Sequence, residues 1–364
     1  MACWAELEAS QISGERLTHV NYAFASIQDG QVVSFMTANF ARLAETDPAL
    51  AALGFDAACA KEEAGLGLAR RLKSAYPHLK VLISIGGWAA EGFSDAALDA
   101  QSRERFAESA LAFMQRFGFD GLDLDWEYPG NAIGGIRARP EDRQNFSALL
   151  RLLRQKVDAA SADDGRTGEA RYLLSIATGV IPSHIEGLDL ARITPDLDFI
   201  GLMTYDLYNG WSTRSGHHAN LFRSKSDPEG DSADDAVRLF LAAGVPAQKL
   251  LLGAAFYGRG MNGVAPENDG LMQPSEPGSN FTRTYDEIRN ALAAPSPWVR
   301  HWDEAAQAAY LYDGRSFLSY EDPESLRAKG RYVREHGLGG AMFWEYSNDR
   351  ARELLGVLYG ALLP

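Results

Sequence analysis

FDGLDLDWEYP, spanning Phe119–Pro129, contains four carboxylates, at Asp120, Asp123, Asp125 and Glu127. Side chains alternate between the two faces of a β-strand, so Asp123, Asp125 and Glu127 would share one face and the apolar residues between them the other. Asp120 has the opposite parity and is expected at the entry to the strand. Like charges held side by side raise one another's proton affinity, and a fold has little structural reason to tolerate them. The pattern therefore predicts acid–base chemistry by carboxylates.

Two other interpretations of this stretch stay open from the residues alone. An exposed acidic strand would be solvated, but it would not need Trp126, Tyr128 and Pro129 beside its carboxylates. A divalent-metal site could also use alternating carboxylates, although it would usually draw oxygen or histidine ligands from elsewhere, and nothing nearby has the spacing. Acid–base chemistry is the interpretation we prefer.

Composition narrows the class of protein. A chain of 364 residues suits one large domain with an insertion, or two domains. The net charge of −14 makes a nucleic-acid partner unfavourable, whereas a neutral ligand is compatible with it. No apolar run is long enough to cross a membrane. Two cysteines, Cys3 and Cys59, are too few for a disulfide scaffold or a cysteine-rich zinc module, and two thiols are favoured over one bridge.

Strand-like apolar runs alternate with helix-like amphipathic runs along the chain. Strands other than the acidic one are expected at His19–Ala25, Lys80–Ile85, Tyr172–Ala177, Asp198–Met203, Leu250–Ala254 and Gly339–Trp344. Helices are expected at Leu66–Tyr76, Ser102–Phe117, Pro140–Val157, Ser232–Ala243 and Thr284–Leu292. This alternation predicts an α/β protein with a parallel sheet, and its repetition favours a (β/α)8 TIM barrel over an open sheet. Polar and aromatic residues follow the strand runs, at the rim where barrel enzymes build their sites.

The acidic stretch resembles the D-x-x-D-x-D-x-E signature of glycoside hydrolase family 18, the chitinases, and DWEYP continues the match. Five further stretches of the chain resemble motifs of this family. They are SIGGW at Ser84–Trp88, MTYDLYNGW at Met203–Trp211, GHHANL at Gly216–Leu221, FYGRG at Phe256–Gly260 and GGAMFWEYSND at Gly339–Asp349. The resemblance covers nearly the whole chain, in the expected order. It implies hydrolysis of β-1,4 linkages between N-acetylglucosamine units of chitin and chito-oligosaccharides, without a cofactor or metal.

The resemblance also implies a substrate-assisted mechanism that retains configuration, in which the substrate's N-acetyl carbonyl attacks the anomeric carbon and forms an oxazolinium ion. Glu127 would protonate the leaving oxygen, because as the last carboxyl on the strand it would reach furthest into the cleft. Asp125 would orient the acetamide, with Asp123 sharing a proton behind it. Tyr205 would hydrogen-bond the acetamide oxygen from the opposite side.

Flat aromatic rings can cover the C–H faces of sugars at low entropic cost. Trp344 would form the floor under the sugar being cleaved, while Trp88 and Trp211 are candidates for the leaving-group side. Polar side chains at the rim would bond to sugar hydroxyls. The remaining expected substrate-binding residues are Asp206, Arg259, Met203, Phe24 and Tyr128.

Two regions are expected to modify the barrel. The span between FYGRG and Tyr312 is too long for an ordinary connection and resembles the α+β insertion of many family 18 chitinases. The expected domains are a barrel at 1–259 and 312–364 and an insertion at 260–311. Only Met1–Trp4 is available for the first barrel strand, which is expected to be short or missing. The protein is expected to be a monomer, with a dimer possible if a second chain covers that gap.

Two kinds of protein with other functions are alternatives to a chitin hydrolase. Chitinase-like lectins commonly lose the terminal glutamate of the signature, whereas Glu127 is present. Endo-β-N-acetylglucosaminidases acting on glycoproteins tend to lack the Trp-Glu-Tyr-Pro continuation and the insertion. A chitin hydrolase is therefore favoured. The start MACWAELEAS lacks the features of a signal peptide, whereas the resemblance implies secretion, so cytoplasmic and extracellular locations both stay open.

Overall fold

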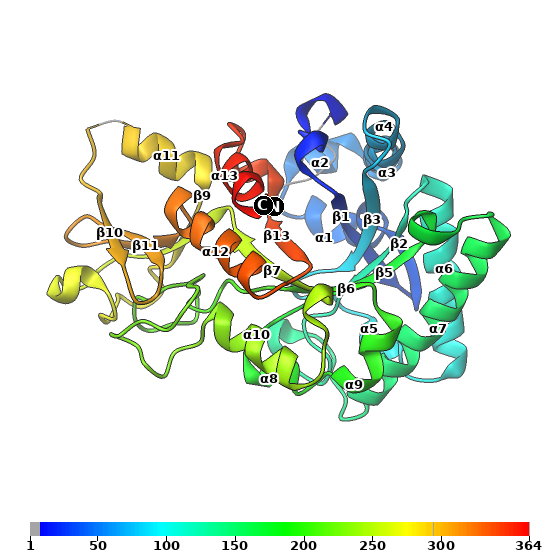
Figure 1. The fold of residues 1–364 in the computed structure, drawn as a ribbon. Coiled ribbons are helices and arrows are strands. Elements are labelled where there is room, and N and C mark those ends of the chain that lie inside the picture. The colour runs from blue at the N-terminus through cyan, green and yellow to red at the C-terminus, as the bar shows by residue number, and fades with distance from the viewer. Residues whose placement is uncertain (1–7, 294, 364) are drawn as a thin grey trace. The chain divides into compact units, whose positions relative to one another are not determined.

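The computed structural model describes residues 8–293 and 295–363 (Figure 1). These residues form two compact units. Of the described residues, unit 1 comprises 8–178 and 182–200, and unit 2 comprises 179–181, 201–293 and 295–363. Each unit is described by itself below. The expected first strand at Met1–Trp4 lies outside the described residues.

Unit 1 is built on a mostly parallel sheet with the strand order β2-β1-β3-β4-β5. Its strands are β1 (His19–Gln28), β2 (Gln31–Ser34), β3 (Lys80–Gly86), β4 (Gly121–Asp125) and β5 (Leu173–Thr178). Neighbouring pairs from β1 to β5 are parallel, and β2 is antiparallel to β1. All five residues of β4 are buried, as expected for a central strand of a parallel sheet that is covered on both faces.

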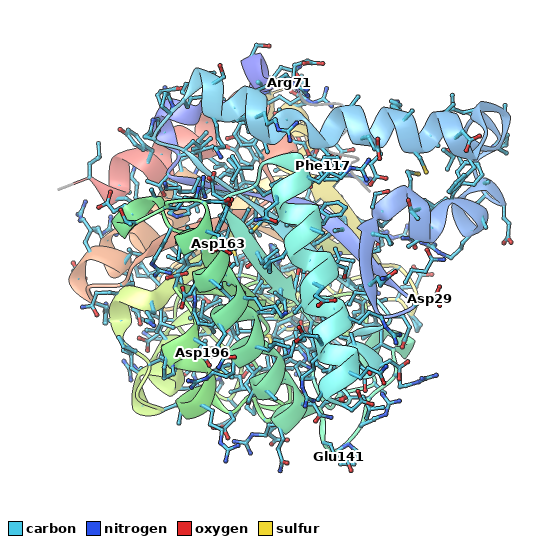
Figure 2. All side chains as sticks on the ribbon, turned by 90° about the vertical axis from the view of Figure 1, so that its right-hand side faces the viewer. Asp29, Arg71, Phe117, Glu141, Asp163 and Asp196 are labelled. Carbon is cyan, nitrogen blue, oxygen red and sulfur yellow. The ribbon has the colours of Figure 1, made fainter. Side chains whose placement is uncertain are left out.

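The helices of unit 1 follow its strands in the chain. They are α1 (Phe35–Ala44), α2 (Pro48–Leu53), α3 (Phe55–Leu66), α4 (Leu68–Ala75), α5 (Phe93–Ala96), α6 (Ala100–Phe117), α7 (Asp142–Asp163), α8 (Pro182–Ile185) and α9 (Leu190–Ile193). In α6 the Asp99 side chain caps the first turn, and Gly118 ends the helix with a φ of +78°. Figure 2 shows α6 and α7 side by side, with Phe117 and Asp163 at neighbouring ends.

Unit 2 contains parallel strands and a separate antiparallel sheet. Strand β7 (Leu250–Ala255) pairs in parallel with β13 (Gly340–Trp344), and β6 (Phe199–Leu202) contains residues of both units. The antiparallel sheet has the order β10-β11-β12-β8-β9. Its strands are β8 (Tyr257–Met261), β9 (Phe281–Thr284), β10 (Val299–Asp303), β11 (Ala308–Tyr312) and β12 (Phe317–Tyr320). The helices are α10 (Ala233–Ala242), α11 (Tyr285–Ala293), α12 (Pro323–Glu335) and α13 (Glu353–Leu362).

Apart from the first strand expected at Met1–Trp4, each strand expected from the sequence is present, with ends that differ by a few residues. The expectation that the acidic strand continues to Glu127 is wrong, because β4 ends at Asp125. Its partner β3 ends at Gly86, which pairs with Asp125 and has a φ of +116°, outside the extended region. Glu127 therefore lies in the segment beyond the strand rather than in its ladder.

Two expectations about the limits of the barrel stay predictions. The antiparallel sheet starts at β8 and ends at β12, so it includes residues on both sides of the expected insertion at 260–311. Within residues 8–293 and 295–363, β1 pairs only with β2 and β3, and β13 pairs only with β7. The described strands therefore do not by themselves close a barrel.

Candidate active site

Asp123 lies in the middle of β4 and is held by serines from both neighbouring strands. The register pairs Asp123 with Ser84 of β3 and with Ser175 of β5. Ser84 Oγ donates to Asp123 Oδ2 at 2.8 Å, and Ser175 Oγ donates to Oδ1 at 2.6 Å. Burial raises the pKa of Asp123, although these hydrogen bonds and one from Asn21 act in the opposite direction. The serines therefore fix the orientation of a carboxyl whose charged form is disfavoured by burial.

Asp125, at the end of β4, is buried with an unsatisfied oxygen. Its Oδ1 atom has no hydrogen-bond partner among the described residues. Burial raises the pKa of Asp125 well above its usual value, and the nearby charges of Glu127 and Asp123 raise it further. That Asp123, Asp125 and Glu127 titrate as a coupled set stays a prediction.

Replacing Asp125 with asparagine is expected to raise the melting temperature at about pH 8 but to change it little at about pH 4. A carboxyl whose pKa is raised on folding stabilises the native state below its unfolded pKa, and that contribution is lost as the pH rises through the folded pKa. Each unit of difference between the two pKa values corresponds to about 1.4 kcal/mol. Asparagine removes this dependence because it does not ionise.

Thermal unfolding of the two proteins across this pH range measures the effect. Asp163→Asn, at an exposed position at the end of α7, is the matched control. If the difference in melting temperature between the parent and Asp125→Asn is the same at every pH, the prediction is contradicted.

Glu127 is the most accessible carboxyl of the series. It is half-buried, whereas Asp123 and Asp125 are buried. The adjacent Trp126 anchors the segment, since its ring stacks on Phe93 with centroids 5.3 Å apart and contacts the edge of Phe146. Because Glu127 is half-buried, a ligand arriving from solvent can reach it, and the two buried carboxyls precede it in β4.

Tyr128, on the other side of Glu127, is packed inside unit 1. Its ring is buried and stacks on His184 of α8, with centroids 3.7 Å apart. Burial lowers the pKa of His184 to about 4, so its imidazole is neutral near pH 7. A substrate contact by Tyr128 stays a prediction, and its ring also has a structural role.

The two glycines of SIGGW allow close contacts, of Gly86 with the backbone at the end of β4 and of Gly87 with the ring of Phe24. A Cβ atom on Gly86 would lie 2.2 Å from the carbonyl oxygen of Asp125, and one on Gly87 would lie 2.8 Å from the ring of Phe24. Both glycines have positive φ, which other residues rarely adopt. Trp88 follows them with 46% of its surface exposed, so its ring is accessible to a ligand.

Unit 2 contributes a second group of expected site residues, centred on Asp206. Arg259 forms a bidentate pair with Asp206, with Nε 2.7 Å from Oδ1 and Nη2 2.6 Å from Oδ2. The hydroxyl of Tyr257 donates to Oδ1 at 2.8 Å, and His218 Nδ1 lies 3.6 Å from the same atom. Burial alone would raise the pKa of Asp206, but the hydrogen bonds from Arg259 and the nearby ring of His218 lower it, so this carboxylate stays ionised.

Tyr205 and Trp344 pack against the same small apolar cluster, which consists of Ala219, Ala255 and Tyr257. The hydroxyl of Tyr205 lies 3.8 Å from the sulfur of Met342 in β13. The neighbouring Met203 is half-buried, and Trp211 is 67% exposed. In unit 2, Tyr205, expected to bind the acetamide, and Trp344, expected to lie under the sugar being cleaved, thus pack against one apolar cluster.

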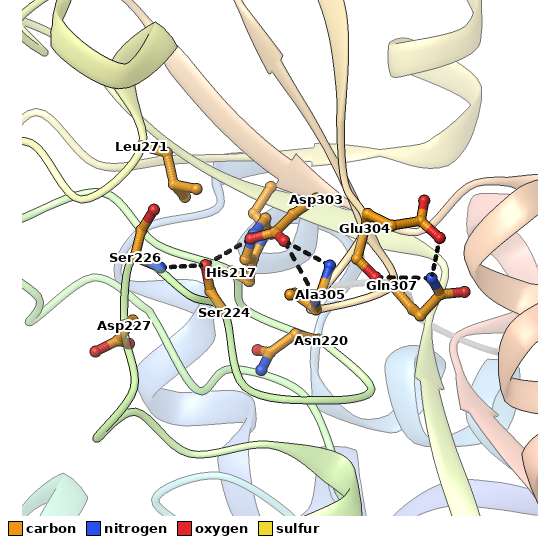
Figure 3. Close-up of polar contacts among 12 residues, drawn as sticks. His217, Asn220, Ser224, Ser226, Asp227, Leu271, Asp303, Glu304, Ala305 and Gln307 are labelled. Carbon is orange, nitrogen blue, oxygen red and sulfur yellow. Dashed lines mark hydrogen bonds and ion pairs between the residues drawn. The ribbon is translucent and has the colours of Figure 1, made fainter.

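GHHANL has a structural role that sequence reasoning missed, and Figure 3 shows it. His217 Nε2 lies 3.2 Å from Oδ2 of Asp303, the last residue of β10, and Ser224 Oγ donates to the same oxygen at 2.5 Å. The other oxygen accepts the backbone N–H groups of Ala305 and Ala306. Burial would raise the pKa of Asp303, but these hydrogen bonds lower it. The ionised Asp303 therefore holds the motif to the β10–β11 turn.

Three further properties of the described residues bear on function. Outside the masked positions, no group of three or more His, Cys, Asp or Glu side chains is arranged to hold a metal ion. Cys59 is a free thiol, while Cys3 lies outside the described residues. Of the described helices, none combines the length and the apolar character that spanning a bilayer requires.

Comparisons of this chain with a family profile and with curated proteins point to the same family. The profile described as "Glycosyl hydrolases family 18" matches residues 2–349. "Chitinase A1" of Niallia circulans is 40% identical over 304 residues, which cover 78% of this chain and 42% of that protein. The chain thus spans less than half the length of this curated relative.

Two solved structures extend the comparison. A glycoside hydrolase family 18 N-acetylglucosaminidase from Paenibacillus barengoltzii has a TM-score of 0.85 and 39% identity, covering 98% of this chain and 96% of that chain. The multi-modular, cell-surface-expressed chitinase ChiW from a Paenibacillus species has a TM-score of 0.88 and 40% identity, covering 100% of this chain and 42% of that chain. With the parallel strands and the antiparallel sheet, these matches confirm the predicted fold class of a TIM barrel with an insertion.

Proposed function

Because the chain belongs to glycosyl hydrolase family 18, we propose that it hydrolyses β-1,4 linkages between N-acetylglucosamine units of chitin and chito-oligosaccharides. The observation that carries this proposal is the carboxyl series at the end of β4, in which buried Asp123 and Asp125 precede the accessible Glu127. The similarity to Chitinase A1 supports the choice of substrate.

In the proposed reaction Glu127 donates its proton to the glycosidic oxygen as the bond to the anomeric carbon breaks. The carbonyl oxygen of the substrate's own acetamide forms a bond to that carbon from the other face, which gives an oxazolinium ion. The ionised Glu127 then takes a proton from water, whose oxygen opens the oxazolinium ring. Two inversions at one carbon retain the configuration.

Asp125 and Tyr205 would orient the acetamide in this reaction. Asp125 Oδ1, which lacks a partner among the described residues, would accept the acetamide N–H. Ionisation of Asp125 as positive charge develops would stabilise the oxazolinium ion, and the proton would pass to Asp123, which Ser84 and Ser175 hold in place. The hydroxyl of Tyr205 would donate a hydrogen bond to the acetamide carbonyl oxygen until that oxygen attacks the anomeric carbon.

The remaining expected residues would bind the sugar units. Trp344, Trp88 and Trp211 would present ring faces to the pyranose C–H groups. The paired side chains of Asp206 and Arg259 would bond to hydroxyl groups, since their mutual hydrogen bonds hold both in one geometry. Roles for Met203, Phe24 and Tyr128 stay predictions.

A second candidate is release of single N-acetylglucosamine units from chain ends. The observation that favours it is the similarity to the Paenibacillus barengoltzii N-acetylglucosaminidase over nearly the full length of both chains. The lectin alternative is not favoured because the chain retains Glu127, and the glycoprotein-directed alternative is not favoured because the chain has the Trp-Glu-Tyr-Pro continuation. We also propose an extracellular location, which the cell-surface expression of the similar chitinase ChiW supports.

Time-resolved product analysis of chitin hexamer distinguishes these functions. A chitinase is expected to release dimers, trimers and tetramers early, with the β-anomer in excess because configuration is retained. Monomer released from the start would favour the N-acetylglucosaminidase. An absence of cleavage by folded protein, or an initial excess of the α-anomer, would contradict the proposed function.

A further inference from the structure

A buried ion pair lies in unit 2 apart from the residues assigned above. Lys329 of α12 and Glu321 just before that helix have side chains that are only 2% and 1% exposed, and their charged groups are hydrogen-bonded to each other. Ser325 Oγ donates to the second carboxylate oxygen of Glu321 at 2.6 Å. Removing two charges from water is costly, and an apolar pair of the same volume is often as stable. The pair therefore suggests a role other than stability.

The lysine is directed at one carbonyl group of β7. Lys329 Nζ donates to the carbonyl oxygen of Gly253 at 3.1 Å, and Thr204 Oγ1 donates to the same oxygen at 2.7 Å. Thr204 is fully buried and directly precedes Tyr205 in the chain. The Gly253 carbonyl group thus accepts hydrogen bonds both from the ion pair and from the residue before Tyr205, the side chain proposed to bind the acetamide.

Gly253 also lies against the backbone just before Tyr205 and pairs with a residue close to the Tyr205 hydroxyl. A Cβ atom at Gly253 would lie 2.3 Å from the carbonyl oxygen of Leu202 and 2.9 Å from the backbone nitrogen of Thr204, so only glycine allows this approach. Across the ladder Gly253 pairs with Met342, whose sulfur lies 3.8 Å from the Tyr205 hydroxyl. Gly253 is therefore one residue away from the hydroxyl end of Tyr205 through Met342, and it adjoins Thr204, which precedes Tyr205 in the chain.

We propose that the Lys329–Glu321 pair is a positioning device for Tyr205, acting through Gly253 and Thr204. The ammonium group holds the Gly253 carbonyl in one orientation, this carbonyl holds the Thr204 hydroxyl, and Thr204 sets the start of the segment bearing Tyr205. Lys329 touches no substrate in this scheme. The part of the inference that concerns catalysis rests on the proposed function, in which Tyr205 binds the acetamide oxygen.

Replacing Lys329 with methionine is expected to lower kcat/KM for chitin hexamer by about 10²-fold, because misplacing a positioning group by about 1 Å costs this much. Thr204→Val breaks the same chain at another point without removing a charge, and it serves if Lys329→Met does not fold. Tyr332→Phe is the matched control. Tyr332 lies on the same helix, is buried, and donates a hydrogen bond to Asp234 that has no connection with Gly253.

Two measurements separate positioning from a merely structural role. In a Tyr205→Phe background, Lys329→Met is expected to cause little further loss of activity, because the group that it positions is already absent. In the NMR spectrum of methyl-labelled methionine, the Met342 signal is expected to move in Lys329→Met and Thr204→Val but not in Tyr332→Phe. Met342→Leu identifies the signal.

The outcomes are distinguishable. The proposal would be overturned if Lys329→Met and Thr204→Val unfold at lower temperature but keep the parental kcat/KM and an unmoved Met342 signal. It would also be overturned if the loss of activity in Lys329→Met multiplies with the loss of activity in Tyr205→Phe. If the parent cleaves no chito-oligosaccharide, the proposed function fails. The shift of the Met342 signal then still decides whether Lys329 positions the surroundings of Tyr205.

Discussion

Replacing Glu127 with glutamine is expected to lower kcat on chito-oligosaccharides by about 10²–10⁴-fold, the usual loss when a general acid is removed. Glutamine keeps the shape of the side chain but cannot give its proton to the glycosidic oxygen. Glu127 is the residue of choice because Asp123 and Asp125 are buried, whereas Glu127 is accessible. Initial rates on chitin hexamer at saturating substrate measure the effect.

Two controls make this result interpretable. Glu186→Gln changes an exposed glutamate of unit 1 and is expected to leave the rate unchanged. Calorimetric titration with the hexamer is expected to give similar affinity for Glu127→Gln and the parent, since the change removes a proton donor and little contact area. Near-parental turnover by folded Glu127→Gln would show that another group supplies the proton.

Substrates without the 2-acetamido group are expected to resist hydrolysis. Fully deacetylated chitosan and cellulose should release at least about 10²-fold fewer reducing ends than acetylated oligomers of the same length, because the attacking oxygen is missing. The two carboxyls in β4 are poor replacements, since both oxygens of Asp123 accept hydrogen bonds from serines and Asp125 is buried with a raised pKa.

A reducing-end assay with size-matched oligomers measures this requirement. Chitosan that has been chemically re-acetylated is the control, and it is expected to regain the rate of the natural oligomer. Efficient cleavage of cellulose or of fully deacetylated chitosan would mean that a protein carboxylate acts as the nucleophile, and the substrate-assisted mechanism would be wrong.

Local pattern was sufficient to predict the elements that carry the site. Lys80–Ile85 reads as a buried strand and is found in β3, and the amphipathic run Ser102–Phe117 is found in α6. Both succeed because side-chain periodicity and burial depend on neighbours close in the chain. The end of the acidic strand was predicted wrongly, because a strand ends where its partner leaves the ladder, and that partner is 39 residues away at Gly86.

The sequence by itself determined which residues are available for chemistry, through the order and spacing of the family's motifs. The tertiary structure decided their partners. Ser175 donates to Asp123 across 52 residues, and Lys329 reaches the carbonyl of Gly253 across 76. Such contacts depend on strand register and on which helix covers which strand. Hydrogen bonds and pKa values are set by groups within a few ångströms in space, so spacing along the chain does not contain them.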